Sequence, residues 1–500
     1  MKKLLIASLL LLSSFTFFSQ NIKINYEVEW QKVYNDELKD LPKSALVKVE
    51  KIFTTAKLNN NSSLLVKSLI YKSKFILTLE EDAQLKIVEQ FHKEIKESTY
   101  PTSNILESVL ADIYWQYYKN NRYKFYRRTK TKNGLDAVDF RTWDSQTMFE
   151  TIGAHFENSL KQPAKLKVED LSNFNEILIL KDSKVYRPTL FDFLAHRATL
   201  FFKNGEPNIG NANYQFELSN TQLFGTNTQF LGYNIKKTDS VSHQNRALEL
   251  IQELTRFHSK DSNPTALIDI TLERLRFVKA NAVFEDKETL YEDALLALQE
   301  EYSSHESSTE IAYHLAKFYN DLASQYNPNK GEKHRFKHAK AVAVCKAAID
   351  TYPKSKGAKK CSNLLNQIEL GSFGITTENF IPTNTHSRFL ISYKNTSKLY
   401  FSAYKLSKEQ IDESVYTSDS LRIAFLNSIN PTKKWESVLR DEKDYRKHST
   451  EVIVPPLEHG YYVILSSEFE DITNHEMRYA FNELQVTDFT LINSESNNNH

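Results

Sequence analysis

Two cysteines, Cys345 and Cys361, are the only ones in a chain of 500 residues. Cys345 lies on the apolar face of the expected helix "HAKAVAVCKAAIDTY", Pro353 ends that helix, and a second helix that carries Cys361 begins near Ser355. At about 1.5 Å of rise per residue, antiparallel packing places both cysteines at a similar height. In an oxidising compartment the spacing therefore predicts a disulfide between Cys345 and Cys361, with two separate buried thiols as the alternative.

Two histidines, His334 and His338, stand four positions apart in "EKHRFKHAK". On one face of a helix, this spacing could bind a metal ion. Basic residues surround the pair, and their charge disfavours a cation, so we interpret the segment as the solvated basic start of a helix. These neighbours are Lys333, Arg335, Lys337 and Lys340.

Asp192 and His196 form a second pair at a spacing of four, in "LFDFLAHRATLFF". This segment is apolar on nearly every face, which predicts a helix buried among neighbours. A buried polar pair is more often an internal hydrogen bond than a catalytic dyad, so we expect Asp192 to bond His196.

One dense basic cluster, "NNRYKFYRRTKTK" at 120–132, has aromatic residues between its cations. It could meet an anionic lipopolysaccharide or the acidic face of a partner protein. We favour a simpler interpretation, the C-terminal end of a helix, where cations complement the helix dipole. The cations are Arg122, Lys124, Arg127, Arg128, Lys130 and Lys132.

Sequence motifs of catalysis and cofactor binding are absent: there is no GxGxxG, P-loop, GxSxG, HExxH or CxxC pattern. We therefore expect no catalytic residues, no cofactor and no metal, and a protein that is not an enzyme. The 64 basic and 63 acidic residues give a net charge of +1, so we expect no nucleic-acid partner.

The first twenty residues, "MKKLLIASLLLLSSFTFFSQ", have a basic start and then an apolar run. This is the pattern of a secretory signal peptide, and the run is short for a membrane anchor, the alternative. We expect cleavage near Gln20, no membrane span in the mature chain, and a location in the periplasm, at the cell surface or outside the cell.

Apolar residues recur at helical spacing from residue 25 to about 370, with turns at "NNNSS" and "TYPTSN". Between 285 and 368, helices with alternating alanine and large apolar residues, one ending in "YPKS", are typical of tetratricopeptide-type repeats. The polar segment 203–234 is expected to be a long loop.

The pattern changes at about residue 370, where Gly371 and Gly374 interrupt the helices and apolar residues begin to alternate. An insert that is helical or irregular is expected at 407–447. Leu457, Gly460 and Tyr462 have the spacing of the tyrosine corner found in immunoglobulin-like sandwiches.

These patterns predict a multidomain protein, α then β: an alpha-solenoid of TPR-like helical repeats followed by an immunoglobulin-like β-sandwich, which the resemblance described below implies to be a macroglobulin domain. The expected parts are a signal peptide at 1–20, a helical region at 21–235, TPR-like repeats at 236–370, the sandwich at 371–488, and the start of a truncated next domain or a linker at 489–500.

Several sequence blocks together resemble the N-terminal helical region of large alpha-2-macroglobulin-like proteins from Bacteroidetes. "ENFIPTNTHSRFLISYKNTSKLYFSAYKLS" resembles the opening strands of their first macroglobulin domain. The resemblance covers most of residues 25–490. The helical blocks are "LPKSALVKVEKIFTTA", "LADIYWQYYKNNRYKFYRRT", "DFRTWD", "YRPTLFDFLAHRATLFF" and "YPKSKGAKKCSNLLNQIE".

The resemblance implies an exported protein of serial sandwiches that takes part in protease trapping, with proteases and other cell-envelope proteins as partners. Some members of that family carry a C-x-E-Q thioester, but neither Cys345 nor Cys361 begins such a motif. We therefore expect a non-catalytic N-terminal portion of such an inhibitor, whose reading frame continues past residue 500. The alternative is an exported helical-repeat module that binds peptides or glycans.

Overall fold

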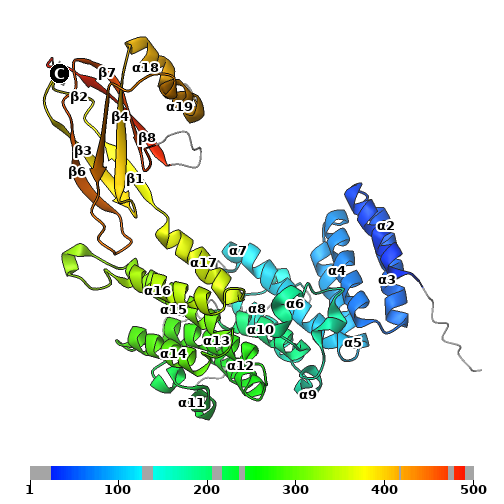
Figure 1. The fold of residues 1–500 in the computed structure, drawn as a ribbon. Helices are drawn as coiled ribbons and strands as arrows, with labels where there is room; N and C mark the ends of the chain where they lie inside the picture. The colour runs from blue at the N-terminus through cyan, green and yellow to red at the C-terminus, as the bar shows by residue number, and fades with distance from the viewer. Residues whose placement is uncertain are drawn as a thin grey trace, which may run out of the picture. The chain divides into compact units, whose positions relative to one another are not determined.

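A computed structural model describes residues 24–126, 139–204, 217–235, 243–415, 418–470 and 478–489. The chain divides into two compact units, Met1–Ala294 and Leu295–His500. Helices come first along the chain and β-strands follow (Figure 1), which confirms the predicted order. The last helix before the strands ends at Glu369 and the first strand begins at Ser372, close to the predicted change at 370/371.

In the described residues of the first unit the regular elements are helices, beside two isolated β-bridges, Asp170 with Thr189 and Leu218 with Ala282. Its α-helices are α2 (Tyr26–Leu38), α3 (Pro42–Leu58), α4 (Ser62–Leu79), α5 (Ala83–Glu97), α6 (Thr102–Asn120), α7 (Arg122–Tyr126), α8 (Ser145–Ser159), α9 (Pro163–Leu166), α10 (Leu190–Phe202), α11 (Asn227–Gly232), α12 (His243–His258) and α13 (Thr265–Asn281). Short 3-10 turns link them: η1 (Phe140–Thr142), η2 (Leu171–Phe174), η3 (Lys181–Val185) and η5 (Thr221–Phe224).

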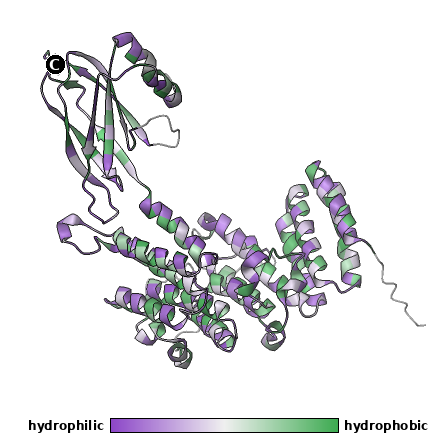
Figure 2. Cartoon of the chain, viewed as in Figure 1, coloured by the Kyte–Doolittle hydropathy of each residue, from purple (hydrophilic) through white to green (hydrophobic). Residues whose placement is uncertain are grey.

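The turn segments start helices where the sequence predicts. In the "NNNSS" turn, Asn61 caps α4 by accepting a hydrogen bond from the Leu64 backbone N at 3.1 Å. The apolar periodicity of α3 becomes a buried face that includes Val49, Ile52 and Ala56. Apolar and polar residues alternate around the helices (Figure 2), so each helix can bury one face and leave the other to solvent.

Helix α10 is buried on most of its faces, as its sequence predicts. The long loop expected at 203–234 is only partly confirmed. Its described residues are 203–204 and 217–234, and the latter stretch contains η5 and α11, which begins with a capping box between Thr226 and Gln229. The reciprocal cap stabilises a helix of six residues that its polar composition conceals.

Helix α14 (Lys287–Glu301) spans the division between the units, and three further helices open the second unit. These are α15 (Ser308–Ala323), α16 (Lys337–Thr351) and α17 (Lys356–Glu369). The predicted break at Pro353 is confirmed, and Ser355 caps α17 by accepting from the Ala358 backbone N at 3.1 Å. Ser355 also shares a hydrogen bond of 2.9 Å with Thr309, which ties the start of α17 to α15.

Gly357 lies where α17 crosses the backbone of α15. A Cβ at this position would stand 2.2 Å from the carbonyl carbon of Thr309, far inside van der Waals contact. We expect Gly357→Ala to lower the free energy of unfolding by about 1–3 kcal/mol, the usual range for overpacking. Urea denaturation would measure this. Gly232→Ala is the control, because nothing lies within 4 Å of its Cβ position, and an equal loss in both variants would contradict the close approach.

Two β-sheets follow the helices. The first has the order β1-β3-β6 and is antiparallel, and the second has the order β2-β8-β7-β4-β5, with β2 parallel to β8. The strands are β1 (Ser372–Thr376), β2 (Phe380–Ile381), β3 (Ser387–Lys394), β4 (Lys398–Leu406), β5 (Lys433–Val438), β6 (His448–Val454), β7 (Gly460–Ser467) and β8 (Tyr479–Val486).

The alternating apolar residues of the two sheets meet in one core. Phe389 and Ile391 of β3 and Leu399 and Phe401 of β4 are all buried in it, as the period of two predicts. Tyr462 of β7 is also fully buried in this core, and burial raises the pKa of its hydroxyl.

The insert expected at 407–447 does contain helices, α18 (Lys408–Val415) and α19 (Asp419–Asn427). Their apolar residues Ile411 and Leu426 pack on Val463 and Leu465, so they cover the outer face of the five-stranded sheet. The insert also contains β5, which the prediction missed. Before Val438, the strand has one large apolar side chain, that of Trp435, which stacks on Phe401 with ring centroids 5.1 Å apart. A single apolar residue gives no alternating pattern from which a strand could be predicted.

In the part of the chain that the structure describes, no helix has the length and apolarity required to cross a bilayer. The expected signal peptide at 1–20 lies outside the described residues. Of the segment expected to begin a next domain or linker at 489–500, only Phe489 is described.

Candidate functional site

The loop between β5 and β6, residues 439–447, combines unusual backbone conformations with a buried charge. Lys443 and Tyr445 have φ values of 60° and 57°, in the left-handed region that side chains disfavour. Asp444, between them, is only 2% exposed. Such conformations persist where the surrounding residues hold the backbone in place, so we expect this loop to make stabilising contacts with other elements.

Asp444 accepts hydrogen bonds from three directions. Its Oδ2 accepts from Arg335 Nε at 3.2 Å, and its Oδ1 accepts from the Arg446 backbone N at 3.0 Å and lies 2.8 Å from His448 Nε2. Arg335 also donates through Nη2 to Glu442 at 3.1 Å. One arginine from the segment between α15 and α16 is therefore held by two carboxylates of the β5–β6 loop.

The electrostatics favour this arrangement. Burial alone would raise the pKa of Asp444, but the hydrogen bonds from His448, Arg335 and the Arg446 backbone outweigh it and hold the pKa below its usual value. Asp444 is therefore an ionised carboxylate whose charge is neutralised locally.

Arg446 makes the opposite connection, from the loop to the helices. Its guanidinium donates to the carbonyl oxygens of Ala323, of His334 at 3.3 Å and of Arg335 at 3.1 Å. It also lies over the ring of Tyr326, 4.4 Å from the centroid. We call Arg335, Glu442, Asp444 and Arg446, with the carbonyls that Arg446 contacts, the loop–helix junction.

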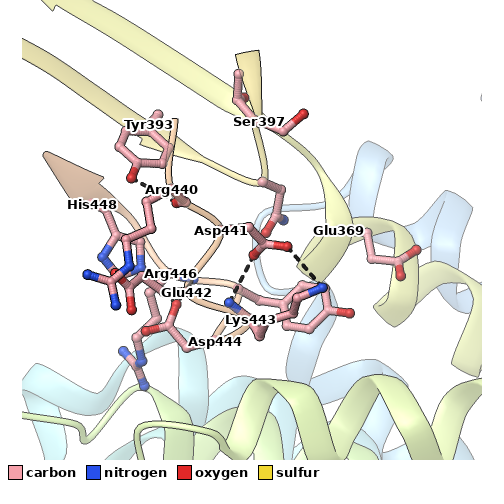
Figure 3. A pocket seen from close by; sticks show the side chains of 13 residues that line it. Glu369, Tyr393, Ser397, Arg440, Asp441, Glu442, Lys443, Asp444, Arg446 and His448 are labelled. Carbon is pink, nitrogen blue, oxygen red and sulfur yellow. Dashed lines mark hydrogen bonds and ion pairs between the residues drawn. The ribbon is translucent and has the colours of Figure 1, made fainter. Parts of the chain in front are cut away.

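A hollow of about 340 Å³ adjoins the loop–helix junction (Figure 3). Charged side chains of both signs line it, including Glu369 from the end of α17 and Asp441 from the loop. The charges are paired within the protein: Asp441 contacts Lys443, with 3.4 Å between Oδ2 and Nζ, and Glu369 contacts Lys346 at 2.7 Å. The loop–helix junction can therefore fix one element against another, and it presents no nucleophile beside a base.

A scan against protein-family models gives no match to this chain, and a search of curated proteins finds none either. The role of the loop–helix junction is accordingly argued from its geometry.

The expected disulfide between Cys345 and Cys361 is not formed in the structure, which has both as buried free thiols. The two side chains do meet between α16 and α17, through a hydrogen bond between the sulfurs. This hydrogen bond, together with burial, raises the pKa of the Cys361 thiol. The predicted juxtaposition is thus observed, whereas the covalent bond is not.

His334 and His338 do not share a helix face. His334 lies before α16 with a φ of 69°, and only His338 belongs to the helix. Burial and the charges of Arg446 and Lys394 lower the pKa of His338 to about 4. No group of three or more His, Cys, Asp or Glu side chains that could hold a metal ion occurs among the described residues.

The expected hydrogen bond between Asp192 and His196 is wrong. Asp192 turns back to the start of α10, where its Oδ2 accepts from Thr189 N at 2.9 Å and Oγ1 at 2.7 Å. Its Oδ1 lies 2.7 Å from His258 Nε2 of α12, and His258 Nδ1 lies 2.7 Å from Asp261. His196 instead lies 3.3 Å from Glu273 of α13. Capping rotates the carboxylate away from the next turn, which the spacing of four does not reveal.

The described part of the basic cluster forms the separate helix α7, after α6 ends at Asn120. Phe125 is buried and Tyr123 is exposed. The remaining cations of the cluster, from Arg127 onwards, lie outside the described residues.

Sequence reasoning missed the loop–helix junction. The available signal was the run "RDEKDYRKH" at 440–448, a density of opposite charges unusual between two strands. The partners, Arg335 and the carbonyl of Ala323 at the end of α15, lie more than one hundred positions away, so no local pattern identifies them.

Proposed function

We propose that this chain is the non-catalytic N-terminal portion of an exported alpha-2-macroglobulin-like protein that contributes to protease trapping in the cell envelope. The observation that carries the proposal is the loop–helix junction. At this junction Arg335 of the helical segment donates to Asp444 of the β5–β6 loop, and Arg446 of the loop donates back to a backbone carbonyl of the helical segment. The two arginines together fix the first β-domain to the helices of its unit. A protein that closes on a protease needs such fixed elements, because a loosely tethered domain transmits no movement.

The finer fold is part of the same proposal. We infer an immunoglobulin-like macroglobulin sandwich, supported by the two sheets with a shared core and by the buried pair Leu457 and Tyr462 flanking Gly460. We likewise infer TPR-like repeats from α15–α17, supported by the close approach at Gly357 and by buried alanines such as Ala316 and Ala341.

The proposed partners are proteases and other cell-envelope proteins. A steric trap leaves the active site of the protease free, and only large substrates are excluded. We therefore expect trypsin, after incubation with the exported product of this gene, to cleave a small chromogenic peptide while losing most of its activity on casein.

The control is trypsin with its catalytic serine replaced, which cannot cut a bait segment and should not be captured in a pull-down. Undiminished casein cleavage would contradict the proposal. Equal loss of both activities would also contradict it, because it would indicate a blocked active site in place of a trap.

A further inference from the structure

A second hollow, of about 670 Å³, lies in the first unit between α4, α5 and α6, and its lining is mainly apolar. Its floor includes Phe91 of α5, Phe140 of η1, and Ile113 and Tyr117 of α6. On α4, Ile70 and Leu77 line it while 42% and 55% exposed. Large apolar side chains left open along a concavity are typical of a binding site.

The lining of this hollow follows one face of α6. Residues at 109, 112, 113, 116, 117 and 120 of α6 contribute, which is the spacing of a single helical stripe. Eleven positions at about 1.5 Å each give a groove about 17 Å long. That length accommodates about three turns of a helix lying along it. We call this hollow the α4–α6 groove.

The charges at the rim of the α4–α6 groove are already paired within the protein. Arg197 donates to the hydroxyl of Ser108 at 2.9 Å and lies 3.6 Å from Asp112, and Lys74 pairs with Glu37. Among the described residues that line the α4–α6 groove, an occupant with a net charge would find its counter-ions, Lys74, Asp112 and Arg197, already engaged. This disfavours anionic lipids and acidic or basic peptides.

Side-chain amides complete the rim, from Gln84, Gln116, Asn120 and Asn121. Gln116 and Asn121 donate within the protein, to Asp112 at 3.4 Å and to the Tyr117 carbonyl at 2.9 Å, and this leaves their amide oxygens as acceptors. An amide carries a donor and an acceptor, so the rim can bond the polar groups of a peptide helix, whatever its sequence. An apolar floor with a neutral amide rim therefore fits an amphipathic peptide whose polar face is uncharged.

We propose that the α4–α6 groove binds an uncharged amphipathic helix of a partner protein, about three turns long, through apolar side chains spaced three, four and seven apart. The proposal does not depend on the role in protease trapping, because the α4–α6 groove belongs to the first unit and the loop–helix junction to the second.

The test is selection from a phage-displayed library of random peptides of about sixteen residues, long enough for the α4–α6 groove and its flanks, against the full chain without its signal peptide. We expect enrichment of peptides with apolar residues at helical spacing and no net charge. Synthetic copies should bind the wild type and lose roughly tenfold or more in affinity to Ile70→Glu and to Leu77→Glu, since a carboxylate replaces an apolar contact.

The matched control is Leu38→Glu, which makes the same change at a leucine of α2 that is 86% exposed and outside the α4–α6 groove. Its affinity should equal that of the wild type. Because all three positions are exposed, thermal melts should show that each variant folds. No enrichment above background, selected peptides with net charge, or equal binding to the groove variants would overturn the proposal. So would binding to neutral phosphatidylcholine vesicles with the same sensitivity to Leu77→Glu, which would assign the α4–α6 groove to lipid.

Discussion

Replacing Asp192 with alanine is expected to lower the free energy of unfolding of the first unit by about 3–5 kcal/mol, the usual cost of removing one partner from a buried ion pair. Asp192 is 0% exposed and His258 is 1% exposed, so the histidine left behind has no water to replace the carboxylate. The substitution also removes the capping box at the start of α10. Urea denaturation followed by circular dichroism measures the change.

The matched control is Asp261→Ala, which removes the second carboxylate on the same histidine. Because the Asp261 side chain is 34% exposed, solvent can replace it, and the loss should be much smaller. Asp192→Asn should fall between the two, since an amide oxygen can still accept from Thr189. Equal effects of Asp192→Ala and Asp261→Ala would show that burial does not decide the outcome.

The same pair makes stability depend on pH. Burial lowers the pKa of His258, but the hydrogen bonds and charges of Asp192 and Asp261 outweigh it and raise the pKa above 6.5. A group whose pKa is raised on folding stabilises the folded state fully below its unfolded value, and that contribution is lost as pH rises through the folded value. The wild type should therefore lose stability as pH rises above 6.5, the ordinary histidine value, and Asp192→Ala should show a smaller slope.

Replacing Arg446 with alanine is expected to lower the free energy of unfolding of the second unit by about 2–3 kcal/mol, because hydrogen bonds from a charged donor to the carbonyls of Ala323, His334 and Arg335 are lost together. The stacking of Arg446 on Tyr326 is lost as well. The β5–β6 loop would then be released, so trypsin should cleave after Lys443 faster than in the wild type.

The control for Arg446 is Arg440→Ala in the same loop. Arg440 pairs with Glu442 at 2.9 Å, but its side chain is 81% exposed, and such surface pairs contribute about 0–1 kcal/mol. Cleavage after Lys443 should be unchanged in this variant. If both variants are cleaved equally fast, the loop is not held by Arg446 and the loop–helix junction does not fix the β-domain.

Local patterns were sufficient where one segment decides its own structure. Helix α17 begins at Lys356 because Ser355, which follows the proline break, caps it. Strand β3 alternates between buried and exposed residues because its apolar residues do. The short helix α11 and strand β5 were missed for the opposite reason. Helix α11 depends on a capping box among polar residues, which show no apolar periodicity. Strand β5 is held by the stacking of a single tryptophan and by its pairing with β4.

The sequence by itself determined the order of the parts: helices with one apolar face up to residue 369, then strands with apolar residues at every second position. Both periods follow from backbone geometry within a few residues. Only the tertiary structure decided which polar groups meet. Asp192 bonds His258 across 66 positions, and Arg446 reaches Ala323 across 123. The pairing of charged side chains depends on their distance and burial in the folded chain, and the local spacing of residues determines neither.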